Sequence, residues 1–180
     1  MNVTDTPQTD TTQTEGAGPV VVAVAIVSAD GVLGDGTDQP WHLREDQKRF
    51  KDLTRGHPVV VGRATFDTFG GPLPGRPHVV VTRDRDWSYP GVRVAHDPHE
   101  ALRMAKELPG GDERVGIIGG GQIYEALLPQ TDVVELTEVD ADAPGDVRFP
   151  QLSPQEWTET RRDDRLAFAF VTYERRPSRT

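Results

Sequence analysis

The segment that decides the fold is "RVGIIGGGQIYEALL", residues 114–128. A short run of mostly branched apolar side chains leads into three consecutive glycines, and a stretch with helical spacing follows. Branched apolar runs favour buried strands, and glycine lets the backbone turn sharply and approach a ligand closely. The segment therefore predicts a strand, a tight turn and a helix, which is the unit from which α/β sheets are built.

The same order recurs along the chain. "HPVVVGRATFDTF", residues 57–69, predicts a strand that ends at Gly62 and a short helix after it. Further buried strands are predicted at residues 20–28, 78–83 and 92–96. A helix should begin after Asp97, because Asp97 can act as the N-cap, Pro98 suits the first helical position and Glu100 completes a capping box.

Two late segments alternate between apolar and polar residues: "VVELTEVD", residues 133–140, and "FAFVTYE", residues 168–174. Alternation of this kind is typical of strands with one solvated face, which occur mainly in antiparallel sheets. The predicted fold class is therefore α/β. We expect one domain with a central, mostly parallel, twisted sheet of about eight strands, an antiparallel C-terminal edge and about four flanking helices.

Composition narrows the class of protein. The 180 residues suffice for one domain, and the absence of cysteine excludes disulfides, thiolate metal sites and cysteine nucleophiles. The net charge of -9 disfavours nucleic-acid binding, and the longest apolar run, residues 20–27, is too short to span a bilayer. At the amino terminus no basic stretch precedes an apolar one, so no secretory signal is evident and a cytoplasmic protein without a membrane partner is expected.

The amino-terminal segment differs in composition from the rest. Residues 1–19 are rich in Thr and Gln and contain acids but no Lys or Arg. Such a segment cannot bury enough apolar surface to become ordered. We expect a disordered tail over residues 1–19, one domain over 20–176, a short C-terminal tail over 177–180, and a monomer.

Three predicted strand ends carry groups suited to phosphate: Gly62 with Arg63 and Thr65, Thr82 with Arg83, and the glycines at 119–121. Ligands of open α/β sheets bind beyond the carboxyl ends of the strands. Each end alone could be a plain turn or a surface arginine, but together they indicate a nucleotide. "GGGQIY" lacks the spacing of a dinucleotide fingerprint, and no P-loop motif is present.

One acid stands in an unusual place in "PWHLREDQKRF", residues 40–50. In a helix from about Leu43 to Thr54, Asp46 shares the apolar face with Phe50 and Leu53. Taken alone, the position favours an acid of the first helical turn, where the helix dipole stabilises a carboxylate; a ligand-binding acid is the alternative. The remaining charged residues of the helix are expected on its solvent face: Arg44, Glu45, Lys48, Arg49, Lys51 and Asp52.

Other candidate sites are weaker. His96 and His99 lie three apart, but Pro98 starts a helix between them and no third ligand is evident, so no metal site is expected. Ser28 and Ser88 lack the surroundings of a nucleophile elbow.

From about Val20 to Arg176 the chain resembles the dihydrofolate reductase family. The resemblance is carried by "DGVLGDGTDQPWHLREDQKRFK", "VVVGRATFDTFGGPLPGRPHVVVTR", "VGIIGGGQIYEALLP", "LTEVDADAPGDVRFP" and "FAFVTYERR", which occur in family order. It implies NADPH-dependent reduction of 7,8-dihydrofolate to tetrahydrofolate, with hydride transfer to pterin C6 and protonation at N5. NADPH is the expected cofactor, with a preference over NADH that depends on two arginines.

By the same resemblance, Asp46 accepts hydrogen bonds from pterin N3–H and the 2-amino group. It does not reach N5; its charge favours the protonated pterin, and a water delivers the proton. Trp41 would anchor that water and Thr137 would hydrogen-bond the acid. The implied catalytic residues are Asp46, Trp41 and Thr137.

The resemblance also implies the binding residues. Phe50 and Leu73 would enclose the folate, and Arg76 would pair with its glutamyl carboxylate. The substrate set is Ile26, Asp46, Gln47, Phe50, Leu73, Arg76, Ile118 and Tyr124. The cofactor set is Ala25, Gly34, Gln39, Gly62, Arg63, Ala64, Thr65, Thr82, Arg83, Gly119, Gly120, Gly121, Gln122 and Ile123.

Residues 34–39 would form an active-site lid that Asp146 helps to hold closed, and a cis peptide would join Gly119 to Gly120. The chain departs from the family pattern at Gly71, where a basic residue is frequent, and at Gln39, where many relatives are apolar. Two alternatives remain: a riboflavin-pathway reductase of similar fold, which "PW…ED…F" and Arg76 disfavour, and a non-catalytic NADPH-binding regulator.

Overall fold

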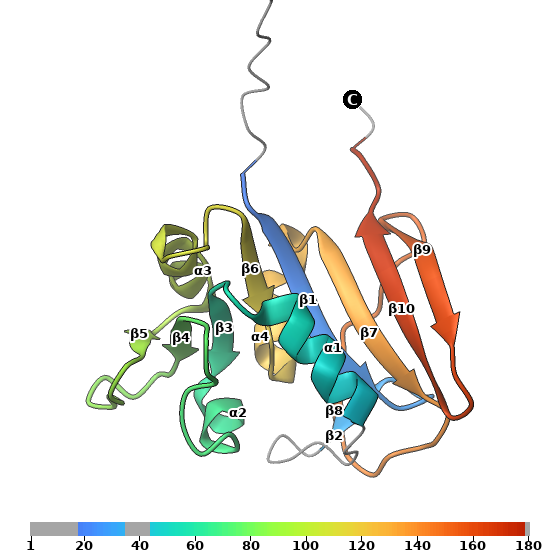
Figure 1. Ribbon diagram of the computed structural model, residues 1–180, viewed down its shortest axis with the longest axis horizontal. Helices are drawn as coiled ribbons and strands as arrows, with labels where there is room; N and C mark the ends of the chain where they lie inside the picture. The colour runs from blue at the N-terminus through green and yellow to red at the C-terminus, as the bar shows by residue number, and fades with distance from the viewer. Residues whose placement is uncertain (1–17, 35–43, 179–180) are drawn as a thin grey trace, which may run out of the picture.

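The structure is a computed structural model that describes residues 18–34 and 44–178. Predictions for residues 1–17, 35–43 and 179–180, including those for Gln39 and Trp41, lie outside the described residues. The centre of the molecule is an eight-stranded sheet in the order β5-β4-β3-β6-β1-β7-β10-β9 (Figure 1). Its strands are β1 (Val20–Val27), β3 (Val59–Gly62), β4 (His78–Val81), β5 (Arg93–Ala95), β6 (Arg114–Ile117), β7 (Val133–Val139), β9 (Trp157–Asp164) and β10 (Phe168–Arg175).

Six neighbouring strands, from β5 to β7, pair in parallel, whereas β10 pairs antiparallel with both β7 and β9. This confirms the predicted fold class, a mostly parallel α/β sheet with an antiparallel C-terminal edge. The central strand β1 is buried on both faces after its first residue. Parallel strands covered by helices on both sides need such unbroken apolar sequence, which is why "VVVAVAIV" does not alternate.

Helices cover the two faces of the sheet. Figure 1 shows α1 (Arg44–Thr54) in front of the sheet and α3 (Pro98–Glu107) and α4 (Gly121–Leu127) behind it. Apolar side chains of α3 and α4 join one buried cluster with the strands. A second cluster, on the other face, unites Phe66 of α2 (Arg63–Asp67) with Val59, Val61, Val80 and Ile118, and Phe50 of α1 packs against it. A single 3-10 turn, η1 (Leu128–Gln130), follows α4.

Both ends of the described domain leave from the same side. The strand β1 begins, and β10 ends, at the edge opposite the carboxyl ends of the parallel strands (Figure 1). The functional groups predicted at the strand ends therefore lie on the far side of the sheet from Gly18 and Ser178.

The structure contains three strands that the sequence did not predict. The strands β2 (Val32–Gly34) and β8 (Val147–Arg148) form a separate antiparallel pair, and both are too short to show a pattern. The edge strand β9 reads "WTETRRDD", which contains no apolar residue after the tryptophan. Pairing with β10 determines that this segment is a strand.

The start of α3 follows the predicted capping with one difference. The Asp97 side chain accepts hydrogen bonds from the amides of His99 (2.8 Å) and Glu100 (3.2 Å), as an N-cap should. The Glu100 carboxylate accepts from the amide of His96 at 3.3 Å rather than from that of Asp97. The expected capping box is therefore displaced by one residue.

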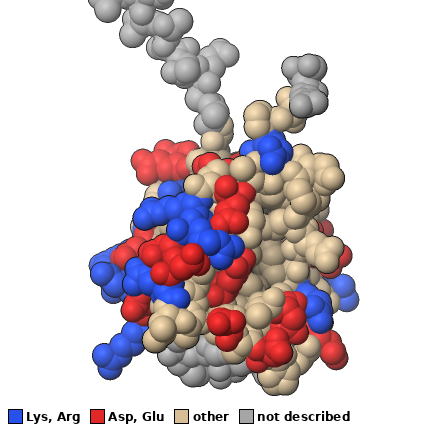
Figure 2. All heavy atoms as spheres, turned by 90° about the vertical axis from the view of Figure 1, so that its right-hand side faces the viewer, with Lys and Arg blue, Asp and Glu red and all other residues tan. Residues whose placement is uncertain are grey.

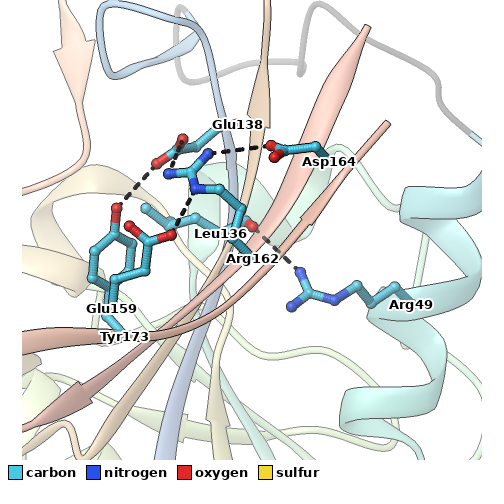
Figure 3. Close-up of polar contacts among 7 residues, drawn as sticks. All are labelled: Arg49, Leu136, Glu138, Glu159, Arg162, Asp164 and Tyr173. Atoms are coloured by element: carbon cyan, nitrogen blue, oxygen red, sulfur yellow. Dashed lines mark hydrogen bonds and ion pairs between the residues drawn. The ribbon is translucent and has the colours of Figure 1, made fainter. Parts of the chain in front are cut away.

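The exposed edge of the sheet is lined with charge. Figure 2 shows acidic and basic side chains interspersed on this side. Arg162 of β9 contacts Glu138, Glu159 and Asp164 (Figure 3), and the distances of these ion pairs are 3.3, 2.6 and 3.7 Å. Exposed ion pairs each add little stability. Charges on an edge strand do, however, oppose pairing with another chain, so we assign this network mainly to solubility.

Glycine is required where α3 ends. A Cβ on Gly111 would lie 2.0 Å from the Ala105 carbonyl oxygen and 2.9 Å from that of Leu108. Gly111→Ala should therefore lower the free energy of unfolding by about 3 kcal/mol, because backbone atoms must move to admit the methyl group. Urea unfolding measures the effect, with Gly18→Ala as the control, since no atom lies within 4 Å of a Cβ there. Equal stability of the two variants would contradict the expectation.

Candidate active site

The carboxyl ends of β3, β4 and β6 and the start of α4 surround a cleft of about 530 Å³. This cleft brings together most of the residues predicted at the three strand ends. The predicted residues that line it are Gly62, Arg63, Ala64, Thr65, Thr82, Arg83, Gly120, Gly121, Gln122 and Ile123. The sequence did not predict the other lining residues: Val81, Asp84, His96, Pro98 and Val147.

The triple glycine forms the floor of this cleft. The peptide bond between Gly119 and Gly120 is cis, and the Gly119 carbonyl accepts a hydrogen bond from the Gly62 amide at 2.8 Å. A Cβ on Gly120 would lie 3.1 Å from the Thr65 hydroxyl oxygen, and one on Gly119 would lie 3.3 Å from the Tyr124 hydroxyl. Backbone, rather than side chains, therefore faces the cleft, as close binding of a dinucleotide requires.

Charge in the cleft is mixed. Arg63 lies with its guanidinium 5.4 Å from the Trp87 ring, and it contacts the carboxylates of Asp84 (3.3 Å) and Asp67 (3.6 Å). Arg83 is exposed beside them. Two arginines can bind a phosphate, but the carboxylate of Asp84 opposes an anion at the same place. Asp84 directly follows Thr82 and Arg83, for which the sequence predicts phosphate binding.

The second part of the site centres on Asp46 in the first turn of α1. The Thr137 hydroxyl of β7 donates a hydrogen bond of 2.5 Å to the Asp46 carboxylate, and Ile26 of β1 is paired with Thr137. The carboxylate is half-buried, and this burial raises its pKa above the ordinary value for aspartate. The hydrogen bond from Thr137 and the charge of Arg49 act in the opposite direction but do not cancel the effect of burial.

Arg49 was expected on the solvent face of α1, and that prediction is wrong. Its guanidinium donates to the Leu136 carbonyl at 3.4 Å (Figure 3), forms an ion pair with Glu135 and lies 4.6 Å from the Phe170 ring. Glu135 also accepts from Thr172 at 2.8 Å. These partners come from β7 and β10, so the contacts fasten α1 to the sheet one turn after Asp46.

An apolar wall is formed by residues of α1, of the loop before β4 and of the cluster beneath them. Phe50 and Leu73 are half-buried and pack against the cluster that contains Ile118. The Arg76 guanidinium lies 5.9 Å from the Phe50 ring and donates to the Thr54 hydroxyl at 2.9 Å. Burial, with a smaller effect of the nearby Arg55 charge, lowers the pKa of Arg76. Arg55 is thus a second cation at this end of the wall, which sequence reasoning missed.

The remaining predicted residues differ in exposure. Tyr124 is buried, and its hydroxyl donates to the Val24 carbonyl at 2.6 Å; burial, and to a lesser extent Asp46, raises its pKa. Tyr124 therefore supports the glycine turn with its ring. Ala25 is buried on β1, whereas Gln47 is exposed.

The base of the predicted lid lies at the small second sheet. Gly34, which ends β2, is paired with Val147, and the exposed Asp146 directly precedes that residue. Asp146 therefore lies where the predicted lid leaves the described part of the chain.

The described residues show neither a metal-binding cluster nor a membrane-spanning helix. Within residues 18–34 and 44–178, no three His, Cys, Asp or Glu side chains cluster as metal ligands would. His96 contacts the Thr82 carbonyl at 2.8 Å, and His99 contacts the Gln130 side chain at 3.2 Å. None of the described helices has the length and apolar character needed to cross a membrane.

Comparison with known proteins identifies close relatives. The sequence model of the family described as dihydrofolate reductase matches residues 20–175. "Dihydrofolate reductase HdrB" of Haloferax volcanii is 43% identical over 172 residues, which are 91% of this chain and 88% of that protein. "Dihydrofolate reductase type 3" of Salmonella typhimurium is 39% identical over 87% of this chain and 98% of its own length. The solved dihydrofolate reductase of Enterococcus faecalis, complexed with NADP(H) and RAB-propyl, superposes with a TM-score of 0.80 at 31% identity, covering 88% of this chain and 97% of that one.

Proposed function

Because the chain belongs to the dihydrofolate reductase family, it reduces 7,8-dihydrofolate to tetrahydrofolate with NADPH, and we propose how its residues divide that task. The family match favours this reaction over the riboflavin-pathway alternative and over a non-catalytic regulator. The observation that carries the assignment of roles is the half-buried Asp46, hydrogen-bonded to Thr137 beside an apolar wall.

Asp46 is proposed to bind the pterin. Thr137 occupies one carboxylate oxygen, and the other remains able to accept from the N3–H and 2-amino edge of the ring. Phe50, Leu73 and Ile118 supply the apolar surface for the flat ring and the aminobenzoyl group. The guanidinium of Arg76, supported by the charge of Arg55, is proposed to bind the glutamyl carboxylate.

The cleft of about 530 Å³ beyond the glycine turn is proposed to hold NADPH. The glycine backbone that lines it, the Thr65 and Thr82 hydroxyls and the guanidinium groups of Arg63 and Arg83 suit the phosphates of a dinucleotide. NADPH supplies the hydride when it is bound. The chain's part is to hold the two rings together and exclude bulk solvent, to which the predicted lid at 34–39 is proposed to contribute. Trp41 is proposed to anchor the one water that delivers the proton.

Proton delivery is proposed to depend on the charge of Asp46. A carboxylate near the pterin favours the protonated ring, and no described residue offers a second acid in the apolar wall formed by Phe50, Leu73 and Ile118. We therefore propose that a water carries the proton to N5, while Asp46 holds the ring and stabilises the positive charge.

The activity is tested directly by absorbance at 340 nm with NADPH and 7,8-dihydrofolate. Oxidation of NADPH that requires the folate is the expected result, and a blank without folate is the control. Absence of any folate-dependent oxidation by correctly folded protein would overturn the proposed function.

Asp84 should limit the preference for NADPH over NADH. Its carboxylate lies 3.3 Å from Arg63 in the cleft, where it offsets the charge available to a 2′-phosphate. We expect Asp84→Asn to lower the KM for NADPH several-fold at low ionic strength and to leave the KM for NADH nearly unchanged, because only NADPH carries that phosphate. Asp86→Asn, an exposed site two residues on, is the control. Equal changes for both cofactors would contradict the prediction.

We further propose that residues 20–176 are the catalytic domain, with 1–19 and 177–180 as extensions, and that the enzyme acts as a cytoplasmic monomer. The domain bounds are supported by the family match over residues 20–175, within which the site residues described above all lie. Analytical ultracentrifugation of the full chain tests the oligomeric state.

A further inference from the structure

We propose that His78 is a positioning residue for the folate, because it fixes the loop that carries Leu73 and Arg76. The inference deepens the proposed function and rests on it. His78 is the first residue of β4, and only 1% of its surface is exposed. The loop before it, "GPLPGRP", residues 71–77, connects α2 to β4.

Both ring nitrogens of His78 contact backbone groups of this loop. Nδ1 lies 2.9 Å from the Arg76 carbonyl oxygen, and Nε2 lies 3.1 Å from the Leu73 amide nitrogen. An amide can only donate and a carbonyl can only accept, so Nε2 is the acceptor and Nδ1 carries the proton. One neutral tautomer therefore satisfies both contacts. Burial lowers the pKa of His78, which keeps the ring neutral at pH 7.

The loop has few other means of holding its shape. Pro72, Pro74 and Pro77 have no N–H, so the amides available for internal hydrogen bonds are scarce. Gly75 adopts a φ of +77°, and its carbonyl accepts from the Gly56 amide at 2.8 Å. That contact fixes Gly75, while the two contacts of His78 fix Leu73 and Arg76 on either side of it.

The imidazole is itself held rigidly. Its ring lies edge-on to Phe66, with 6.1 Å between ring centroids, and its residue is paired with Val59 of the neighbouring strand. The Val59 amide donates to the Pro77 carbonyl at 2.9 Å, which fixes the start of β4. His78 therefore links the rigid sheet to two residues of the loop. One is Leu73, which belongs to the apolar wall, and the other is Arg76, which is proposed to bind the glutamyl carboxylate.

Three substitutions separate the two contacts. His78→Leu removes both, His78→Gln keeps an acceptor near the position of Nε2, and His78→Asn keeps a donor near that of Nδ1. We expect His78→Leu to raise the KM for dihydrofolate about tenfold, with an unchanged dissociation constant for NADPH, and the two amide variants to show intermediate values. With dihydropteroate, which lacks the glutamyl group, the increase should be smaller because Arg76 then has no carboxylate to bind.

Val79→Ala is the matched control. Val79 is the next residue of β4 and is fully buried, but it belongs to the cluster that contains α3 and α4, on the other face. It should lower stability without a selective change in the KM for dihydrofolate. An unchanged KM in His78→Leu, an equal loss of NADPH affinity, or amide variants as defective as His78→Leu would each overturn the proposal. Since wild-type activity is measured in the same assay, failure of this inference is distinct from failure of the proposed function.

Discussion

Asp46→Asn should reduce turnover at neutral pH by about a hundred- to a thousandfold while leaving NADPH affinity unchanged. Asparagine retains an oxygen that can accept the Thr137 hydrogen bond of 2.5 Å, so the local structure should persist. It removes the negative charge that favours the protonated pterin, and stabilisation of developing charge is commonly worth this much in rate. The rate of the variant should rise as the pH falls, because solution then supplies the protonated pterin.

Stability distinguishes this effect from misfolding. Burial raises the pKa of Asp46 in the folded protein above its value in the unfolded chain. At neutral pH the folded state must therefore hold a carboxylate that burial disfavours, and the free energy of unfolding falls as the pH rises through the folded pKa. The neutral amide removes that penalty, and Asp46→Asn should unfold at a temperature no lower than that of the wild type. Asp52→Asn, the same change at an exposed position of α1, is the control for turnover. Wild-type rates in Asp46→Asn across the pH range would refute the assigned role.

A 2,4-diaminopyrimidine inhibitor should lose about a thousandfold in affinity for Asp46→Asn. Such a compound accepts a proton on its ring and then presents a cation with two N–H donors to the carboxylate, a bidentate and charge-assisted pair. Removing one partner of a desolvated ion pair costs about 3–5 kcal/mol, which corresponds to this change. Inhibition constants against dihydrofolate, measured in parallel for the wild type and Asp46→Asn, give the ratio.

The pH dependence supplies an independent check on the inhibitor. Affinity for the wild type should fall as the pH rises above the pKa of the free inhibitor, because the cation is the form that Asp46 binds. For Asp46→Asn this dependence should be weak. Non-competitive inhibition, or equal affinity of the two proteins, would show that the compound binds elsewhere.

Much of the architecture could be predicted because short stretches of sequence indicate the strands and helices without reference to distant residues. Unbroken apolar runs mark β1, β3 and β4, and Asp97 followed by Pro98 marks the start of α3. The strand β9 could not be predicted in this way, since its exposed charges give no alternation and only its pairing with β10 makes it a strand.

The site residues also divide into those that local sequence indicates and those that only the folded structure shows. Asp46 was notable because its charge conflicts with the apolar face of its helix, and the glycine turn because three consecutive glycines are unusual. Arg49 gave no such signal: its partner Glu135 lies 86 residues further along the chain, so only the folded structure shows that the guanidinium is not a solvent-facing group. His78 was read as part of a strand, since nothing local shows that both of its ring nitrogens bind the preceding loop.

The start of β1 and the end of β10 lie on the side of the sheet away from the strand ends that form the site (Figure 1). An affinity tag, a fluorescent protein or a surface linker joined directly at Gly18 or Ser178 would therefore attach on the side away from the substrate entrance. Immobilised or fused forms of the enzyme should keep free access for folate and dinucleotide without redesign of the catalytic side.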